Sequence, residues 1–444
     1  MSKPRPVAGR GPFTVMAQGP LRGAITAPGD KSITHRALLI AALTMGESRI
    51  RRPLDAADTR ALARALQALG ASVDWPQGGD ATVHGFGVGG AWQPGGPLDL
   101  GNSGTAARLL AGVLATSGAE AMLTGDASLS RRPMARVADP LKLTGADLRT
   151  APGGTLPLWI AGAPSPMAFS YRLPVPSAQV KSALLLAALA APGVTRVVEP
   201  VPTRDHSERM LAAAGADLHV GATDGAREII VRGERELRPC EWAIPGDPSS
   251  AHFPLLAALL VPGSDVAVTG VLLSPARAEH VQVLRDMGAD IGVEITGDWL
   301  GDPVATIRAR SGRLRAMPIA PSPALIDEWP AFFVATAFAH GRTELRGLGE
   351  LRGKESDRLA TMAEGLRALG VAVEKLEDGI VIQGQDGAPF AGGVALATHG
   401  DHRVAMALAV AGLAAGAPVT LDDMACVETS YPAFHSDLSA LGAW

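Results

Sequence analysis

Residues Leu69-Gly70-Ala71 close a helix-like stretch, and close variants of this tripeptide recur five more times along the chain. The later copies are Thr144-Gly145-Ala146, Ala214-Gly215-Ala216, Met287-Gly288-Ala289, Leu369-Gly370-Val371 and Leu441-Gly442-Ala443. Successive glycines of the series are 70 to 82 residues apart. Chance matches in a chain with 52 glycines would not keep that spacing, so we interpret the tripeptides as the ends of six repeated supersecondary units.

The repeats predict amphipathic helices, most of which are followed by a pair of strands. Before the first turn, Leu62, Leu66 and Leu69 fall on one helical face, and the glycine that follows suits the left-handed residue at a helix end. Residues 72–75 and 82–86 then alternate between apolar and polar side chains, as the strands of a hairpin do. This pattern indicates an α/β fold.

The two ends of the chain complement each other in this scheme. The sixth helix, before Gly442, is followed by no strand pair, whereas residues 13–27 have the pattern of a strand pair that no helix precedes. We therefore expect the N-terminal strands to complete the last repeat, and Trp444 either to pack against them or to stay exposed. Three repeats then fall in each half. We predict one domain at 30–245 and a second at 1–29 plus 246–444, with hinges near 28–31 and 244–248.

The composition argues against several classes of protein. A net charge of -4 disfavours a surface that binds nucleic acid or an acidic membrane through broad basic charge. The two cysteines, Cys240 and Cys426, have neither the spacing of a zinc site nor the density of a disulfide framework. Apolar runs stay well below the roughly 18 residues that cross a bilayer. We expect a monomeric, cytoplasmic protein without metal or organic cofactor.

Two polar loops ahead of apolar helices are candidate anion sites. Residues 30–36, Asp-Lys-Ser-Ile-Thr-His-Arg, place helix-capping residues beside cations, and free N–H groups at a helix start attract phosphate or carboxylate. Residues 101–108, Gly-Asn-Ser-Gly-Thr-Ala-Ala-Arg, allow close backbone approach through two glycines. The spacing of the second loop is neither that of a P-loop nor that of a dinucleotide site. An ordinary capped helix start remains the alternative for each loop.

Further polar strings fall at loop-to-helix junctions of successive repeats, at residues 131–134, 177–182, 203–206, 354–358 and 401–403. Each alone would be an ordinary solvated surface, but pseudo-symmetry would bring them to corresponding ends of the two halves. The cations that would converge are Lys31, Arg36, Arg132, Arg204, Lys354, Arg358 and Arg403. A cationic cleft in an otherwise acidic chain suits polyanionic substrates, and Asp327 and Glu355 are the acid/base candidates beside it.

These strings, in this order, resemble the EPSP synthases, which are members of the enolpyruvyl transferase family. The resemblance covers essentially the whole chain. It rests on Pro28-Gly29-Asp30-Lys31-Ser32 with His35-Arg36, Gly101-Asn102 with Gly104-Thr105, Arg132-Pro133-Met134, residues 177–182, residues 354–358 and Asp401-His402-Arg403. It implies two similar domains, each of three βαβαββ repeats with pseudo-threefold symmetry, that close on substrates held between them.

The reaction implied by the resemblance transfers the enolpyruvyl group of phosphoenolpyruvate to the 5-hydroxyl of shikimate 3-phosphate, by addition and elimination, in the shikimate pathway. The residues implied to bind shikimate 3-phosphate are Lys31, Ser32, Arg36, Ser177, Ala178, Gln179, Arg204, Asp327 and Lys354. Those implied to bind phosphoenolpyruvate are Lys31, Gly104, Arg132, Gln179, Glu355, Arg358 and Arg403. Asp327 would take the hydroxyl proton, and Glu355 with Lys31 would transfer the methylene proton.

The resemblance also indicates a subtype. Plant and enteric members have serine, tyrosine and lysine where this chain has Ala178, Arg204 and Thr429, and these differences resemble the divergent bacterial class that includes glyphosate-insensitive members. One determinant of insensitivity in that class is an alanine at the position of Gly104, whose methyl group crowds the inhibitor. Because glycine is retained here, we expect glyphosate to bind.

Two other functions compete with this interpretation. UDP-N-acetylglucosamine enolpyruvyl transferase shares the fold, but it typically has Lys-Asn where this chain has Lys31-Ser32, and often a reactive cysteine in a loop of its N-terminal half that neither Cys240 nor Cys426 matches. A non-catalytic scaffold that binds phosphorylated metabolites is the second alternative. The retained acid/base candidates argue against it.

Overall fold

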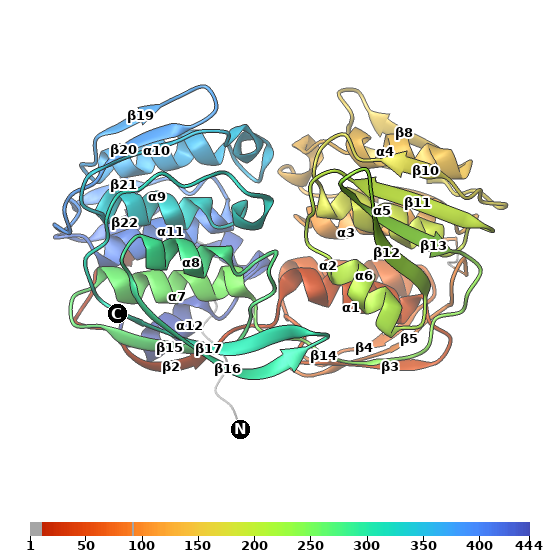
Figure 1. Cartoon of the computed structure of the whole chain (residues 1–444), viewed down its shortest axis with the longest axis horizontal. Coiled ribbons are helices and arrows are strands. Elements are labelled where there is room, and N and C mark those ends of the chain that lie inside the picture. The colour runs from red at the N-terminus through yellow and green to blue at the C-terminus, as the bar shows by residue number, and fades with distance from the viewer. Residues whose placement is uncertain (1–10, 91–92) are drawn as a thin grey trace. The chain divides into compact units, whose positions relative to one another are not determined.

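The structure of the protein is a computed structural model, and it describes residues 11–90 and 93–444. The described chain separates into two compact units (Figure 1). The N-terminal unit is Gly29–Ile244, and the C-terminal unit is Pro245–Trp444 together with the described residues up to Pro28. Each division falls one residue before the boundary expected from the sequence. Residues 1–10 of the expected segment 1–29 lie outside the described residues.

The six repeat turns have the backbone conformation that their glycines predict. Gly70, Gly145, Gly215, Gly288, Gly370 and Gly442 all have φ between 84° and 102°. That region strains an L side chain and costs glycine nothing. Each of these glycines follows a helical segment by one or two residues, so the tripeptides end helices in all six repeats.

The described part of the N-terminal unit holds three four-stranded sheets. Their strand orders are β14-β3-β5-β4, β6-β7-β9-β8 and β10-β11-β13-β12. The strands are β3 (Glu47–Arg51), β4 (Ser72–Asp74), β5 (Ala81–His84), β6 (Leu98–Asp99), β7 (Glu120–Thr124), β8 (Asp147–Ala151), β9 (Thr155–Ala161), β10 (Ser170–Arg172), β11 (Val194–Glu199), β12 (Asp217–Thr223), β13 (Ala226–Arg232) and β14 (Glu241–Ala243). In each sheet a parallel pair joins an antiparallel hairpin. That order is the βαβαββ repeat.

Helices fill the interior of this unit. They are α1 (Lys31–Ala42), α2 (Ala57–Ala68), α3 (Gly104–Leu114), α4 (Ala135–Leu141), α5 (Ala178–Ala188) and α6 (His206–Ala213). Helices α1, α3 and α5 are buried on nearly every side, which suits their runs of Ala and Leu. Helices α3 and α5 approach so closely that a Cβ on Gly112 would lie 2.2 Å from the carbonyl oxygen of Ala183.

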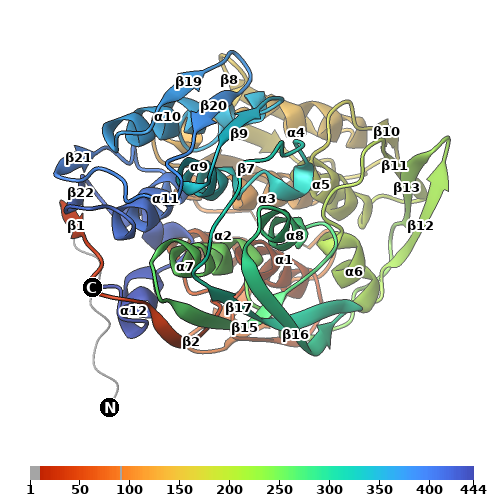
Figure 2. The same ribbon diagram turned by 60° about the vertical axis from the view of Figure 1, so that its left-hand side comes forward.

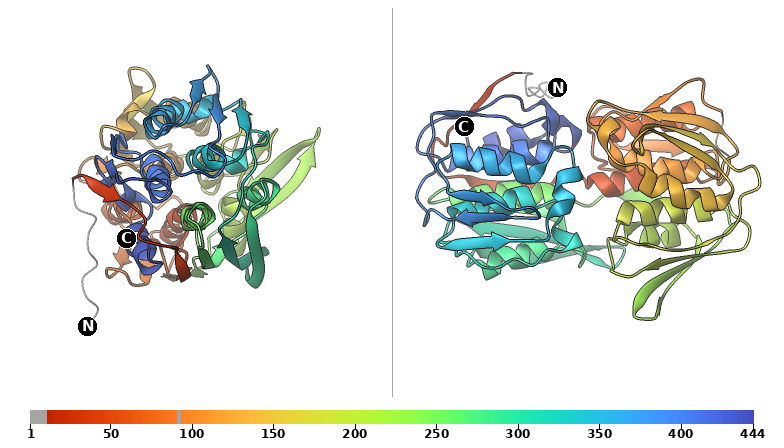
Figure 3. Two further views of the ribbon diagram at one scale, coloured as in Figure 1. Left: turned by 90° about the vertical axis from the view of Figure 1, so that its left-hand side faces the viewer. Right: turned by 90° about the horizontal axis from the view of Figure 1, so that it is seen from above.

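The described part of the C-terminal unit has a similar plan with smaller sheets, one of four strands and two of three. Its sheets have the orders β16-β17-β15-β2, β18-β20-β19 and β1-β22-β21. The strands are β1 (Phe13–Val15), β2 (Arg22–Thr26), β15 (Asp265–Leu272), β16 (Asp290–Trp299), β17 (Asp302–Arg310), β18 (Arg342–Leu345), β19 (Val373–Lys375), β20 (Ile380–Gln383), β21 (Val394–Leu396) and β22 (Val419–Leu421). The helices are α7 (Pro248–Leu260), α8 (Glu279–Asp286), α9 (Trp329–Phe338), α10 (Arg358–Ala368), α11 (His402–Leu413) and α12 (Phe434–Ala440). Helices α7, α9 and α11 are buried along their whole length, and the left view of Figure 3 looks nearly along them.

The N-terminal strands divide between two sheets, which corrects the expectation that both complete the last repeat. Strand β1 does so, pairing antiparallel with β22 beside β21 (Figure 2). Strand β2 instead pairs in parallel with β15, in the first sheet of the unit. A parallel partner needs a crossover, and β2 obtains one because the whole N-terminal unit intervenes before β15. Trp444 packs edge-on against Phe13, with ring centroids 5.4 Å apart.

Candidate active site

Lys31 begins the first buried helix of the N-terminal unit. The carboxylate of Asp30 caps α1 by accepting from the N–H of Ile33 at 2.8 Å. The Lys31 ammonium forms an ion pair with Asp58 at 3.0 Å, and Asp58 lies in the first turn of α2 and is buried. Lys31 is therefore a cation at a helix start, held in place by a carboxylate. Sequence reasoning did not single out Asp58, although its place in the first turn of an amphipathic helix was a usable signal.

Arg36 lies one turn further along α1 and is almost completely buried. Its Nε donates to the hydroxyl of Ser207 at 2.7 Å, its Nη2 to the hydroxyl of Ser182 at 2.8 Å, and its Nη1 to the carbonyl oxygen of Ser32 at 3.0 Å. Three elements, α1, α5 and α6, thus fix the plane of the guanidinium. A guanidinium held in this way is pre-organised for an anion, because little rotamer entropy is left to lose.

The loop at residues 101–104 places Gly104 against two guanidinium groups. A Cβ on Gly104 would lie 2.8 Å from Nη1 of Arg108 and 3.1 Å from Nη1 of Arg132. Arg132 donates to Asn102 at 2.5 Å and to Ser128 at 3.2 Å. Because Gly104 has no side chain, two guanidinium groups approach its backbone closely, and two adjacent cations at a helix start favour an anion.

Arg108 connects this loop to helix α5. Its Nη1 donates to Oε1 of Gln179 at 2.8 Å, its Nη2 donates to the carbonyl oxygen of Pro133 at 3.1 Å, and Nε2 of Gln179 donates to Thr105 at 3.0 Å. Gln179 was among the expected site residues, whereas Arg108 was not. The signal was available, because an arginine four residues after Gly104 lies on the same face of the helix.

The C-terminal unit gathers its candidates around one buried guanidinium. Arg358, the first residue of α10, is 2% exposed in its side chain. It pairs with Asp401 at 2.8 and 3.2 Å and with Glu355 at 2.8 Å. Its Nη1 is buried without a hydrogen bond, and Asp327 Oδ1 lies 4.0 Å from that nitrogen. The two acid/base candidates, Asp327 and Glu355, are thus brought together by Arg358.

The positive charge of Arg358 is stable to pH. Burial acts to lower the pKa of Arg358, but the carboxylates of Asp401 and Glu355 outweigh burial and raise that pKa above its ordinary value. Asp401 is completely buried and caps α11 by accepting from the N–H of Arg403 at 2.9 Å. Asp401 organises the site, yet it was not among the candidates expected from the sequence.

The remaining candidates are less constrained in the structure. Ser177 caps α5 by accepting from the N–H of Val180, and Ala178 and Arg204 are partly exposed. Lys354 pairs with the exposed Glu350 at 2.9 Å. Within either unit taken by itself, the described residues bring no three His, Cys, Asp or Glu ligand atoms together.

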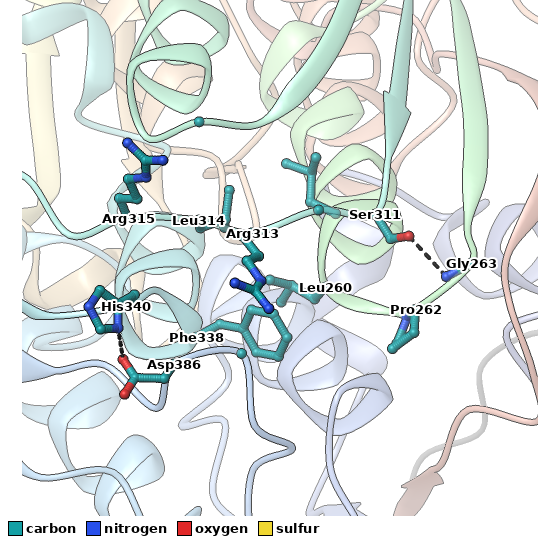
Figure 4. A pocket seen from close by; sticks show the side chains of 14 residues that line it. Leu260, Pro262, Gly263, Ser311, Arg313, Leu314, Arg315, Phe338, His340 and Asp386 are labelled. Atoms are coloured by element: carbon teal, nitrogen blue, oxygen red, sulfur yellow. Dashed lines mark hydrogen bonds and ion pairs between the residues drawn. The ribbon is translucent and has the colours of Figure 1, made fainter.

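The C-terminal unit also has a cavity of about 880 Å³ away from these residues (Figure 4). Its walls include Leu260 and Phe338, the last residues of α7 and α9, together with Arg313 and Arg315. Asp327 lies just before the opposite end of α9. Cations near helix C-termini offset the negative ends of the helix dipoles, which gives the two arginines a structural explanation. We therefore place no part of the candidate site in this cavity.

The family model of EPSP synthase (3-phosphoshikimate 1-carboxyvinyltransferase) matches residues 15–438. The chain belongs to the EPSP synthase family. A 3-phosphoshikimate 1-carboxyvinyltransferase of Sphingopyxis alaskensis is 52% identical over 437 residues, which cover 97% of this chain and 98% of that protein. That of Parvibaculum lavamentivorans is 52% identical over 436 residues, covering 97% and 96%.

Solved structures agree with the EPSP synthase assignment. An EPSP synthase from Acinetobacter baumannii matches with a TM-score of 0.84 and 40% identity, covering 98% of each chain. The enolpyruvyl transferase NikO from Streptomyces tendae matches with a TM-score of 0.78 at 20% identity, which shows the shared fold. The enolpyruvyl transferase fold expected from the sequence is therefore confirmed.

The expected reaction is confirmed with the family. EPSP synthases transfer the enolpyruvyl group of phosphoenolpyruvate to shikimate 3-phosphate, in the shikimate pathway, and this chain is a transferase of that kind. The roles of the individual residues stay a prediction. No helix among the described residues is long and apolar enough to cross a membrane.

Proposed function

We propose that, in enolpyruvyl transfer, the N-terminal unit mainly binds the anionic substrates and the C-terminal unit mainly carries out proton transfer. In the N-terminal unit, Arg36 and Ser177 bind shikimate 3-phosphate, and Gly104 with Arg132 binds phosphoenolpyruvate. Ser32, Ala178 and Arg204 complete the shikimate 3-phosphate set, and Lys31 and Gln179 contact both substrates. The fixed guanidinium of Arg36 and the two guanidinium groups beside Gly104 support this assignment.

In the C-terminal unit, Asp327 accepts the proton of the 5-hydroxyl as its oxygen attacks C2 of phosphoenolpyruvate. Glu355, with Lys31 of the N-terminal unit, delivers a proton to C3, so that the methylene becomes a methyl group. Arg358 and Arg403 stabilise the phosphate and carboxylate charge, and Lys354 contributes to binding shikimate 3-phosphate.

The second step reverses the proton transfer at C3. The methyl group of the tetrahedral intermediate returns a proton to Glu355, the C2–O bond to phosphate breaks, and inorganic phosphate leaves with the proton that Asp327 accepted in the first step. The carbon–carbon double bond forms again, and the enolpyruvyl group is now attached to the shikimate oxygen. No electrons leave the two substrates, so the step needs no redox partner.

The observation that carries this proposal is the position of Asp327 and Glu355 around one buried guanidinium. Glu355 pairs with Nη2 of Arg358 at 2.8 Å, and Asp327 lies 4.0 Å from Nη1. The Arg358 guanidinium thus holds Glu355 by an ion pair and lies near Asp327, so that one cation positions both side chains. A proton acceptor and a proton donor held side by side are what addition and elimination require.

The test measures phosphate release with both substrates present. Asp327→Asn and Glu355→Gln keep the shapes of the side chains and should each lower kcat by about 100-fold or more, because general acid/base catalysis is lost. Glu364→Gln, on an exposed position of α10, is the matched control and should keep wild-type activity.

Solvent deuterium separates the two roles. In D2O, the wild-type reaction should place deuterium on the vinyl carbon of the product, and Glu355→Gln should slow that exchange more than Asp327→Asn does. Near-normal kcat in either variant would refute the role given to that residue.

Three further properties belong to the proposal. The enzyme acts as a monomer of two domains, the N-terminal and C-terminal units; it works in the cytoplasm; and it binds glyphosate at the position of phosphoenolpyruvate. The retained Gly104 supports glyphosate binding. Light scattering on the purified protein gives the mass that tests the monomer, and inhibition competitive with phosphoenolpyruvate tests the inhibitor site.

A further inference from the structure

The two phosphoenolpyruvate-binding segments of the N-terminal unit are joined by a buried histidine and a buried serine. His35 and Ser103 are 0% and 1% exposed. Nδ1 of His35 lies 2.7 Å from the carbonyl oxygen of Lys31, and Nε2 of His35 lies 2.8 Å from the hydroxyl of Ser103. Ser103 directly precedes Gly104. The pair therefore links the backbone of the catalytic lysine candidate to the loop that forms the anion pocket.

The chemistry of these groups determines the direction of every hydrogen bond. A carbonyl oxygen only accepts, so Nδ1 of His35 carries the hydrogen and Nε2 is an acceptor. Ser103 must then donate its hydroxyl hydrogen to Nε2. Its oxygen accepts in turn from the N–H of Ala106 at 3.1 Å and so caps helix α3. One chain of hydrogen bonds runs from Lys31 through His35 and Ser103 to the start of α3.

His35 keeps this tautomer at any working pH. Burial, and then the charges of Lys31 and Arg36, lower the pKa of His35 to about 3 against the opposing hydrogen bond to the Lys31 carbonyl. The imidazole is a rigid spacer, because its two ring nitrogens hydrogen-bond in fixed, divergent directions within one plane. The hydrogen-bonded linkage of Lys31, His35 and Ser103 thus acts as a strut of constant length.

We propose that His35 and Ser103 are positioning residues that set the phosphoenolpyruvate pocket by holding the Gly104 loop at a defined place relative to Lys31. This inference rests on the proposed function, in which Lys31 and Gly104 contact phosphoenolpyruvate. The shikimate 3-phosphate contacts depend less on the strut, because Arg36 has its own anchors on Ser182 and Ser207. Breaking the strut should therefore affect one substrate more than the other.

The experiment determines KM for each substrate in Ser103→Ala and His35→Leu. Each variant should raise KM for phosphoenolpyruvate by about three- to tenfold, the effect of one ordinary hydrogen bond, and leave KM for shikimate 3-phosphate nearly unchanged. The double variant should resemble the single variants rather than multiply their effects, because both remove the same linkage. His35→Gln retains a side-chain acceptor for Ser103 and should restore most of the lost affinity.

Ser48→Ala is the matched control. Ser48 is equally buried in the same unit, and it bonds to Thr44 and to the N–H of Cys240, neither of which belongs to the strut. It should lower the melting temperature without changing KM for phosphoenolpyruvate. If Ser103→Ala and His35→Leu likewise lower only the melting temperature, or raise both KM values equally, the positioning role is overturned.

Lys31→Met separates failure of this inference from failure of the proposed function. If Lys31→Met leaves KM for phosphoenolpyruvate unchanged, the proposed site itself is wrong. If Lys31→Met impairs binding while the Ser103 and His35 variants do not, the site stands and the strut is refuted. If His35→Leu fails to fold, Ser103→Ala and His35→Gln still report on the linkage.

Discussion

The guanidinium of Arg358 donates to Asp401 and Glu355, and Asp327 lies 4.0 Å from it. One residue thereby connects the start of α10 with the start of α11 and with the loop before α9. Removing such a cation would take a counter-charge from the completely buried Asp401 carboxylate, which is costly in a protein interior. The positions of the acid/base candidates therefore depend on a residue proposed to bind substrate.

Gly104→Ala is expected to discriminate between substrate and inhibitor. The new Cβ would lie 2.8 Å from Nη1 of Arg108, which is held by Gln179 and cannot move freely. We expect KM for phosphoenolpyruvate to rise a few-fold and the inhibition constant of glyphosate to rise by about tenfold more, or roughly 1.4 kcal/mol, since the longer ligand loses more room.

Steady-state inhibition measured at several phosphoenolpyruvate concentrations gives both constants. Gly95→Ala is the control, because a Cβ there meets nothing within 4 Å. Equal inhibition of the wild type and Gly104→Ala would contradict the prediction.

His35 should make the fold sensitive to acid. The pKa of His35 is lowered from 6.5 to about 3 by burial, so the unfolded chain binds a proton between these values that the folded chain does not. The stability that His35 contributes is complete above pH 6.5 and is lost as the pH falls toward 3. From pH 7 to pH 5 this loss is about 2 kcal/mol.

Denaturation by urea at about pH 7 and about pH 5 measures this loss of stability. His35→Gln cannot take up that proton, so its free energy of unfolding should fall less than that of the wild type over the same interval. A variant that loses as much stability as the wild type would show that His35 does not titrate in this way.

At the scale of elements, the buried helices position the site. Helices α1, α3 and α5 each begin at candidate residues, and α10 and α11 begin at Arg358 and immediately after Asp401. Their apolar bodies are buried and their polar first turns carry the chemistry. Free N–H groups and the positive end of each helix dipole favour anionic substrates at these starts.

Gly112→Ala tests the close packing of α3 on α5. Alanine is the better helix former by about 1 kcal/mol, but its Cβ would lie 2.2 Å from the carbonyl oxygen of Ala183. Steric overlap with backbone should outweigh propensity, so we expect a net loss of about 1–3 kcal/mol and a lower melting temperature. Calorimetry beside Gly95→Ala checks this result, and a stabilised Gly112→Ala would show that the helices can separate.

At the scale of the molecule, each unit is completed by a strand from the far end of its sequence. Strand β14 joins β3 in the N-terminal unit, and β1 joins β22 in the C-terminal unit. Val15 of β1 is fully buried, and a Cβ on Gly412 of α11 would lie 3.1 Å from it. The N-terminal strand is therefore part of the core of the C-terminal unit.

Val15→Asp should destabilise the C-terminal unit selectively, because it buries an unpaired charge. Hydrogen exchange should show lost protection in β22 and α11, while α1 and α3 of the N-terminal unit stay protected. Met16→Asp is the control, since Met16 is 46% exposed and carries the same new charge. Uniform loss of protection in both units would contradict the prediction.

Much of this architecture could be predicted from local pattern. The glycine of each repeat predicts a residue with left-handed backbone conformation, and all six glycines have it. Strand β2 could not be assigned in the same way, because its partner β15 lies more than two hundred residues away and no local signal specifies a parallel partner. Asp401 could not be recognised as a site residue for a similar reason, and the helix positions of Asp58 and Arg108 do not reveal their partners. The importance of these three residues comes from contacts with Lys31, Gln179 and Arg358.

The repeat period, the helix ends and the family followed from the sequence alone, because helical periodicity, glycine turns and the order of motifs are properties of neighbouring residues. That Asp401 and Asp327 lie beside Arg358, and that His35 connects Lys31 to Ser103, were decided only by the tertiary structure. Those contacts join residues that are far apart in the chain or cross between elements. They depend on how buried helices pack, which local sequence does not encode.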